Sequence, residues 1–99
     1  MSDETTVRFD PDHDRYVAEV GGEYAGVAQF RPEGDDVWVF THTVVDESME
    51  GRGVGSALVR AALDGARENG KRIEPQCPFV AAYVRKHHDW DDLLEPPAA

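Results

Sequence analysis

Residues 50–63, EGRGVGSALVRAAL, place glycines at positions 51, 53 and 55 directly before an apolar stripe with helical spacing. The first amides of a helix lack intrahelical partners and carry partial positive charge, so they attract anions. Glycines let a phosphate approach the backbone closely and accept positive φ, and Arg52 adds a cation. The segment indicates either a phosphate-binding loop or a merely flexible connection between a strand and a helix.

The residues do not match the motifs of several other kinds of site. The loop lacks the Lys and Ser/Thr of the nucleotide P-loop, and Leu58 stands where a dinucleotide fingerprint has its third glycine. The run HHD at 87–89 does not indicate a metal site, because adjacent side chains on a helix point about 100° apart. One cysteine, Cys77, excludes an internal disulfide, and no Cys/His cluster has zinc-ligand spacing. We expect no metal.

The composition is strongly acidic. The 99 residues carry 20 Asp and Glu against 10 Lys and Arg, a formal net charge of -10, which disfavours nucleic acid as a partner. The acids are spread along the chain and lysine occurs only at 71 and 86, which suggests a halophilic protein whose self-repulsion is screened by salt. The start does not resemble a signal peptide, and no apolar run is long enough for a membrane span. We expect a cytoplasmic protein without a membrane partner.

The length allows one domain, residues 1–99, with fraying at 1–5 and 95–99. Strands are predicted at 7–10, 15–20, 24–30 and 71–75, with turns at 21–23 and 31–36. The run VWVFTHTVV, 37–45, has apolar side chains on both faces and predicts a central strand in a sheet that is covered on both sides. Helices are predicted at 54–69, where Asn69-Gly70 is a stop signal, and at 78–88 after Pro78; Trp90, Leu93 and Leu94 pack a final segment on the core.

This order predicts an α/β fold with a mixed sheet. Antiparallel strands are followed by a β-α-β-α unit, whose crossover helix makes 37–45 and 71–75 a right-handed parallel pair. Ligands bind such sheets beyond the carboxyl ends of the parallel strands. His42 and Cys77 fall at those ends, so we expect them near a site.

The loop resembles the R/Q-x-x-G-x-G/A signature of the GNAT superfamily of acetyl-CoA-dependent N-acyltransferases, with residues 50–55 in its six places. The segments HTVV (42–45), GVGSALVRAALDGARENG (53–70) and IEPQCPFVAAYVRKH (73–87) are similar to the minimal, single-domain branch, so the likeness covers nearly the whole chain. Glu50 departs from the pattern, since the superfamily usually has Gln or Arg there.

The resemblance implies two parallel strands that splay, with acetyl-CoA between them and its pyrophosphate on the backbone amides of the loop. The amine acceptor, a small amine or a lysine-like side chain of a protein, approaches from the other side and attacks the thioester directly in a ternary complex. The coenzyme-binding residues implied are Thr43, Val44, Val45, Glu50, Gly51, Arg52, Gly53, Val54, Gly55 and Ser56.

Such a transfer requires a base for the ammonium, a donor for the oxyanion and an acid for the thiolate. His42 is the candidate base, because imidazole titrates near neutral pH; a core histidine is the alternative. Cys77, before the helix, has a lowered thiol pKa if its thiolate meets the helix amino end. It donates a proton, carries the acetyl group transiently or lines the pocket; a buried, inert cysteine is the alternative. Tyr83 is the rival acid, or packs one turn after Phe79.

The leading prediction is therefore an N-acetyltransferase with acetyl-CoA as cosubstrate. A non-catalytic module that binds acetyl-CoA or CoA is the alternative, and a protein that interacts through its acidic surface is third. The glycine loop, His42 and Cys77 at one end of the sheet favour the first two. Oligomeric state is not predicted.

Overall fold

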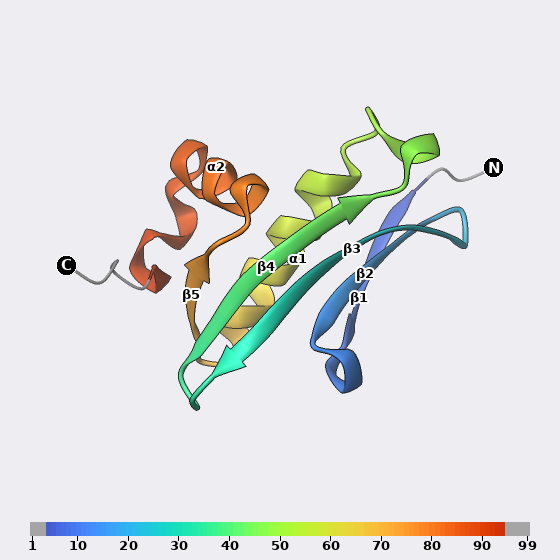
Figure 1. Cartoon of the computed structure of the whole chain (residues 1–99). Coiled ribbons are helices and arrows are strands. Elements are labelled where there is room, and N and C mark those ends of the chain that lie inside the picture. Colours follow the sequence, from blue (N-terminus) through green and yellow to red (C-terminus); the bar gives the residue numbers. More distant parts are fainter. Residues whose placement is uncertain (1–3, 95–99) are drawn as a thin grey trace.

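The computed structural model describes residues 4–94, which form a five-stranded sheet in the order β1-β2-β3-β4-β5 (Figure 1). The first four strands pair antiparallel, and β4 and β5 pair parallel, so the predicted mixed fold is confirmed. The predicted frayed ends at 1–3 and 95–99 lie outside the described residues, and Thr5 begins the first strand. The strands are β1 (Thr5–Asp10), β2 (Arg15–Val20), β3 (Glu23–Glu33), β4 (Val37–Val45) and β5 (Arg72–Pro75).

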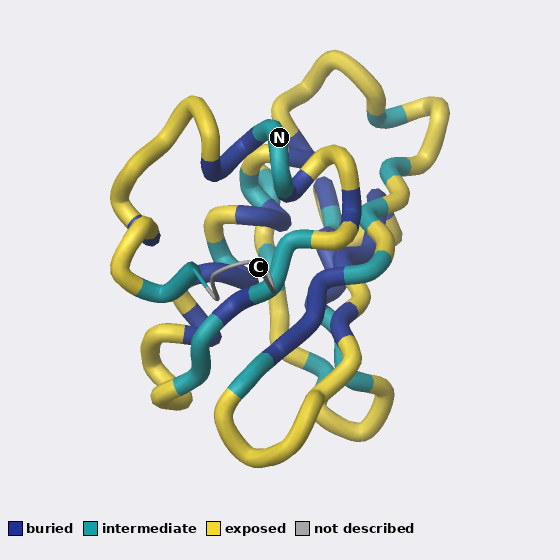
Figure 2. Tube along the Cα trace, turned by 60° about the vertical axis from the view of Figure 1, so that its left-hand side comes forward, coloured by how far each residue is buried: buried dark blue, intermediate teal, exposed yellow. Residues whose placement is uncertain are grey.

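Helix α1 (Val54–Glu68) follows β4 and crosses to β5, as predicted. Its apolar residues recur every third or fourth position, so one stripe faces the sheet. Leu58 and Leu63 are fully buried there against the aromatic side chains of the sheet, among them Phe30 and Phe40. Asn69 caps the carboxyl end, and Gly70 follows with φ 69°, the left-handed conformation expected of a helix stop. In Figure 2 the buried stretches run through the interior and the connecting loops are exposed.

Helix α2 (Pro78–Lys86) ends two residues earlier than predicted. His87 leaves the helical conformation, with φ -124° and ψ 111°, and the chain continues as the short helix η3 (His88–Leu93). Trp90 is buried, and its Nε1 donates to Asp64 of α1 at 2.9 Å. This final segment packs on the core as the apolar residues predicted.

Strand β3 is longer than predicted, because residues 31–33 belong to it and not to the turn. Pairing with β2 ends at Gln29, whereas pairing with β4 continues to Glu33. Pro32 therefore lies where β3 has one free edge, and a proline without an N–H is tolerated at such an edge.

A sheet covered on both sides was predicted. The second face has no helix over β3 and β4 among the described residues, although Val17, Val27 and Val39 are buried on that face. Phe30 and Phe40 face α1, whereas β4 positions opposite Gln29 and Val27 face away from it. Figure 1 views the sheet from this second face, with α1 behind β4 and no helix of residues 4–94 in front of β3 and β4. We call this second face the open face.

An irregular register in β4 decides which side chains reach the open face. Phe30 pairs with Phe40 and Gln29 pairs with His42, so Thr41 is an extra residue on β4. The alternation of faces shifts by one residue at this bulge. His42 consequently lies on the open face and is exposed, while Thr43 faces α1.

The parallel pairing of β4 and β5 is short. It joins Val37–Phe40 to Arg72–Pro75, and the carbonyl oxygen of Phe40 then accepts hydrogen bonds from the amides of Gln76 and Cys77 at 3.1 and 2.9 Å. Beyond Phe40 the two strands separate, because β4 continues to Val45 whereas the segment after β5 enters α2. This is the splay that the resemblance implied.

Candidate functional site

A groove of about 440 Å³ opens at the carboxyl end of β4. Its walls are the α1-facing side of β4, the loop from β4 to α1, the first turn of α1 and one aromatic ring of α2. The lining residues are Thr43, Val45, Met49, Glu50, Gly51, Gly53, Val54, Gly55, Ser56 and Phe79.

The loop that forms one wall is held at its start. Asp46 donates its amide to the carbonyl oxygen of Ala25 at 2.8 Å, which ties the end of β4 to β3. The Asp46 carboxylate accepts hydrogen bonds from the amide and the hydroxyl of Ser48 at 3.0 and 2.6 Å, and these bonds hold the pKa of Asp46 below its usual range. The short helix η2 (Glu47–Met49) follows and brings Met49 to the groove.

The amino end of α1 is formed by glycines in the left-handed region. Gly51 has φ 83° and Gly53, the N-cap, has φ 78°, conformations that side chains other than Asn and Asp rarely adopt. Among the described residues no side chain caps this helix, and its first turn contains no acid. The first-turn amides, with the positive end of the helix dipole, therefore remain available to an anion.

Gly55 is needed for a different reason, namely the close approach of an aromatic ring. A Cβ atom at position 55 would lie 2.6 Å from Cζ of Phe79. The ring thus lies directly over the first turn of α1, yet 43% of Phe79 is exposed. A large exposed aromatic residue beside an uncapped helix end offers a flat apolar surface to a bound molecule.

The predicted coenzyme-binding residues mostly meet in this groove. Two do not: Val44 lies on the open face, 53% exposed, and Arg52 is exposed outside the lining. Two lining residues, Met49 and Phe79, were missed. Phe79 carried a signal, because an apolar residue in the first turn after Pro78 does not fit the buried stripe of α2 formed by Val80, Tyr83 and Val84.

Cys77 is the N-cap of α2 and is buried, with 5% exposed. Its Sγ lies 3.6 Å from Oγ1 of Thr43, which lines the groove. Burial raises the pKa of the thiol, but the amide of Val80, the hydroxyl of Thr43 and the amide of Phe79 favour the thiolate, so the pKa is lowered overall. The sulfur nevertheless accepts no capping hydrogen bond from the first turn of α2.

We expect the thiolate absorbance of Cys77 to titrate at a pH below that of an ordinary cysteine, and Thr43→Val to raise its pKa because the hydroxyl no longer stabilises the anion. The measurement is an ultraviolet pH titration, in which the one cysteine of the chain gives the thiolate signal. Thr41→Val, on the same strand, is the control and should not move the midpoint. A wild-type midpoint at or above the ordinary value would contradict the expectation.

His42 does not share the lining of the groove. It lies on the open face, in a row of directly paired residues that runs across four strands. Thr43, the next residue, contacts Cys77 from the opposite face of β4. The strand therefore separates His42 from the groove. The row consists of Asp10, Arg15, Gln29 and His42.

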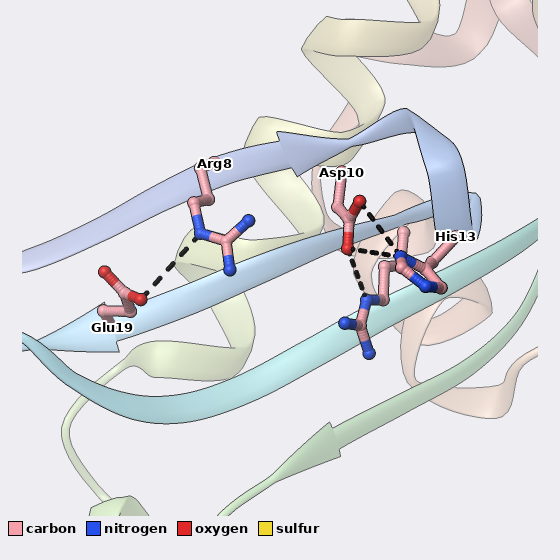
Figure 3. Close-up of polar contacts among 5 residues, drawn as sticks. Arg8, Asp10, His13 and Glu19 are labelled. Carbon is pink, nitrogen blue, oxygen red and sulfur yellow. Dashed lines mark hydrogen bonds and ion pairs between the residues drawn. The ribbon is translucent and has the colours of Figure 1, made fainter.

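Two arginines in or near this row form ion pairs with acidic residues. Arg15 Nε and His13 Nδ1 lie 2.9 and 3.0 Å from Asp10 Oδ2, and these partners hold the pKa of Asp10 below its usual range. Arg8 lies 3.8 Å from Glu19, as Figure 3 shows together with the Asp10 contacts. The charges at the β1 and β2 end of the row are thus paired, and His42 lies at the β4 end.

Tyr83 lies away from the first groove. It is buried, and its ring centroid is 4.4 Å from that of His87 and 5.7 Å from that of Trp90. It lines two further grooves between α1 and α2, of about 440 and 210 Å³. The structure thus brings the glycine loop, Thr43 and Cys77 together, but not Tyr83.

The run 87–89 does not converge on one point. His88 Nδ1 lies 3.0 Å from Asp91, whereas the ring of His87 lies tilted by 36° against the ring of Tyr83. Within residues 4–94 no three potential ligands group as a metal site would require. In the same part of the chain, no helix is both long and apolar enough to cross a membrane.

Fold and site together define a class of protein: a mixed sheet whose parallel strands splay beside a glycine-capped helix end that can hold an anion. The family profile for GCN5-related N-acetyl-transferase matches residues 15–93. The chain therefore belongs to the GCN5-related N-acetyltransferase family, and the resemblance found in its sequence is confirmed. A comparison with curated proteins found no match.

Solved structures agree with this assignment. A GCN5-like protein from Staphylococcus aureus, determined by NMR, has a TM-score of 0.70 at 20% identity, over 94% of this chain and 90% of the other. Ard1 from Thermoplasma volcanium has a TM-score of 0.62 at 20% identity, over 86% and 81%. Rv2747 from Mycobacterium tuberculosis, in complex with CoA and NLQ, has a TM-score of 0.59 at 25% identity, over 71% of this chain and 46% of the other. The first two show the fold, and the third shows it with CoA bound.

Proposed function

We propose that the protein transfers an acetyl group from acetyl-CoA to an amine acceptor, which attacks the thioester directly in a ternary complex. The observation that carries the proposal is the amino end of α1, which opens on the groove without a capping side chain from the described residues. The CoA complex of Rv2747 supports the same ligand class.

The groove offers backbone amide donors that suit the pyrophosphate of the coenzyme. A Cβ atom at Gly51 or Gly53 would meet no heavy atom of the described residues within 4 Å, their chain neighbours aside, so a pyrophosphate can reach the amides that follow. Glu50 also lines the groove, and its carboxylate would weaken the grip on an anion where the family usually has Gln or Arg. When bound, the coenzyme supplies an acetyl thioester, which places an electrophilic carbonyl carbon within reach of an amine.

The two faces of β4 separate the roles of the remaining residues. His42, on the open face, accepts the proton that the acceptor ammonium loses, directly or through water. Cys77, on the groove side beside Thr43, lies where the coenzyme thiolate would leave, and it either returns a proton to that sulfur, carries the acetyl group transiently or lines the site. Tyr83 packs between the helices.

The acceptor is a cationic amine, either a small molecule or a lysine-like side chain. The net charge of -10 raises the local concentration of cations near the protein and lowers that of other anions. A cytoplasm of high salt is consistent with the same charge, because screening then acts over a few ångströms. A non-catalytic module that holds acetyl-CoA is the second candidate, favoured by Glu50 at the groove.

Measurements of acetyl-CoA binding and of acetyl transfer, on the wild type and on two histidine variants, distinguish the two candidates. We expect acetyl-CoA to raise the melting temperature in high-salt buffer, and His42→Ala to lower acetyl transfer to an amine panel by about 100-fold while binding is retained. His88→Ala, which removes an exposed histidine paired with Asp91, is the control and should leave transfer unchanged. Absence of a thermal shift would exclude both candidates, and binding without transfer to any amine would favour the module.

A further inference from the structure

Acidic side chains on the open face of the sheet mostly have an arginine partner. Three ion pairs hold them, at 3.8, 2.9 and 3.3 Å: Arg8–Glu19, Arg15–Asp10 and Arg31–Glu33. The register places a fourth acid, Glu74 of β5, on the same face, because it pairs with Val39. Arg72, two residues earlier on that strand, donates to the carbonyl oxygen of Leu94. Glu74 is therefore a strand carboxylate of the open face that makes no ion pair within residues 4–94.

The Glu74 carboxylate is held from one side only. Nε2 of Gln76 donates to its Oε2 at 2.7 Å, and the amide of Gln76 donates to the carbonyl oxygen of Phe40 at 3.1 Å. Gln76 is thus fixed where β4 and β5 separate, and its side chain turns back to Glu74. From the described residues Oε1 of Glu74 accepts no hydrogen bond, and the residue is only partly buried. A carboxylate with a free oxygen at this place can bind a cationic group of a ligand.

Glu74 and His42 lie on either side of the strand separation, both on the open face. His42 follows Val39, the partner of Glu74, by three residues, and one of these, Thr41, is the extra residue of the bulge. Neighbouring strands lie about 4.8 Å apart and each regular residue rises about 3.3 Å, so the two side chains leave the sheet about 8 Å apart. At that distance they do not share one ammonium group, but they can hold two groups of one small molecule.

We propose that Glu74 binds a second ammonium group of the acceptor, so that an aliphatic diamine of about four or five carbons is the preferred substrate. The inference rests on the proposed function, because it takes His42 as the base. Glu74 suits the end of the molecule that does not react, since a carboxylate beside the reacting nitrogen would favour its unreactive ammonium form.

The transfer itself follows the proposed reaction. The ammonium near His42 gives one proton to the imidazole, and the resulting amine forms a bond to the acetyl carbon. As the C–S bond breaks, the nitrogen loses its second proton and the coenzyme sulfur takes up a proton, so that an amide and the coenzyme thiol are formed. The other ammonium group remains on Glu74 throughout.

Acetyl transfer to a diamine and to a monoamine of equal chain length, measured at moderate salt, tests the assignment. We expect wild type to use 1,4-diaminobutane with a kcat/KM about 10-fold higher than that for butylamine, mainly through a lower KM. Glu74→Gln should abolish this preference by raising the KM for the diamine. Glu74→Asp keeps the charge on a shorter side chain, so it should keep a preference and shift the optimum toward 1,5-diaminopentane.

Glu33→Gln is the matched control, because Glu33 is an exposed acid of the same face, paired with Arg31, and its loss changes the net charge equally. This variant should keep the preference of wild type. Loss of the preference in both Gln variants, or an equal fall in kcat/KM for both amines in Glu74→Gln, would overturn the assignment. Equal kcat/KM for the two amines in wild type would also overturn it, while the proposed function would stand. If no amine accepts the acetyl group, the proposed transfer fails and the assignment fails with it.

Discussion

Replacing Gly53 by aspartate is expected to weaken coenzyme A binding by about 100-fold or more without loss of the fold. Gly53 is the N-cap of α1 with φ 78°, and Asp is among the few residues that adopt this region readily. The new carboxylate would lie at the helix end that the pyrophosphate needs, and two like charges about 4 Å apart repel by about 4 kcal/mol near a protein surface. Titration of coenzyme A and a thermal melt measure the two effects.

Gly53→Asn separates charge from size, because asparagine has nearly the same shape and tolerates the same backbone region. We expect it to weaken binding by about 10-fold, less than the aspartate variant does. If both variants bind coenzyme A as wild type does, the anion site is not at the amino end of α1, and the proposed function loses the observation that carries it.

Replacing Gly65 by alanine is expected to lower the free energy of unfolding by about 2 kcal/mol, or the melting temperature by roughly 10 °C. Gly65 is buried in the last turn of α1, and a Cβ atom there would lie 1.7 Å from the hydroxyl oxygen and 2.5 Å from Cζ of Tyr16. Tyr16 is itself buried, next to Phe30 and Trp38, so its ring has little room to move. The overlap outweighs the gain of about 0.5–1 kcal/mol that alanine brings to a helix.

A double-mutant cycle tests the cause. Tyr16→Phe removes the atom closest to the new Cβ, so Gly65→Ala should cost at least about 1 kcal/mol less in that background. Denaturant unfolding of the four proteins measures the coupling. If Gly65→Ala lowers the free energy of unfolding equally in both backgrounds, or if it stabilises the wild type, α1 and the sheet can move apart easily at this contact.

Much of the fold follows from local patterns in the sequence. Val54, Leu58, Ala62 and Ala66 define one stripe of α1, and the stop at Asn69-Gly70 ends it where predicted. Alternation and turn residues likewise place the strands, because these signals act over a few neighbouring residues. The glycine loop was found in the same way, since its spacing before a helix already implies exposed amides.

The composition of the groove depends on contacts between distant segments. Met49 and Phe79 are 30 positions apart in the chain, and they line one groove because α2 returns beside the first turn of α1. Tyr83, on the same helix as Phe79, faces separate grooves between the helices. Helical spacing shows which residues share a stripe, but the neighbour that the stripe meets is set by packing.

The sequence by itself determined the order of the elements, the glycine-capped helix and the family, because each depends on residue types within one short segment or on a motif. The tertiary structure alone decided which side of the sheet each candidate residue occupies. One extra residue at Thr41, set by pairing with β3, turns His42 to the open face and Thr43 toward Cys77. Side chains alternate along a strand, so a one-residue shift in register reverses every face that follows it.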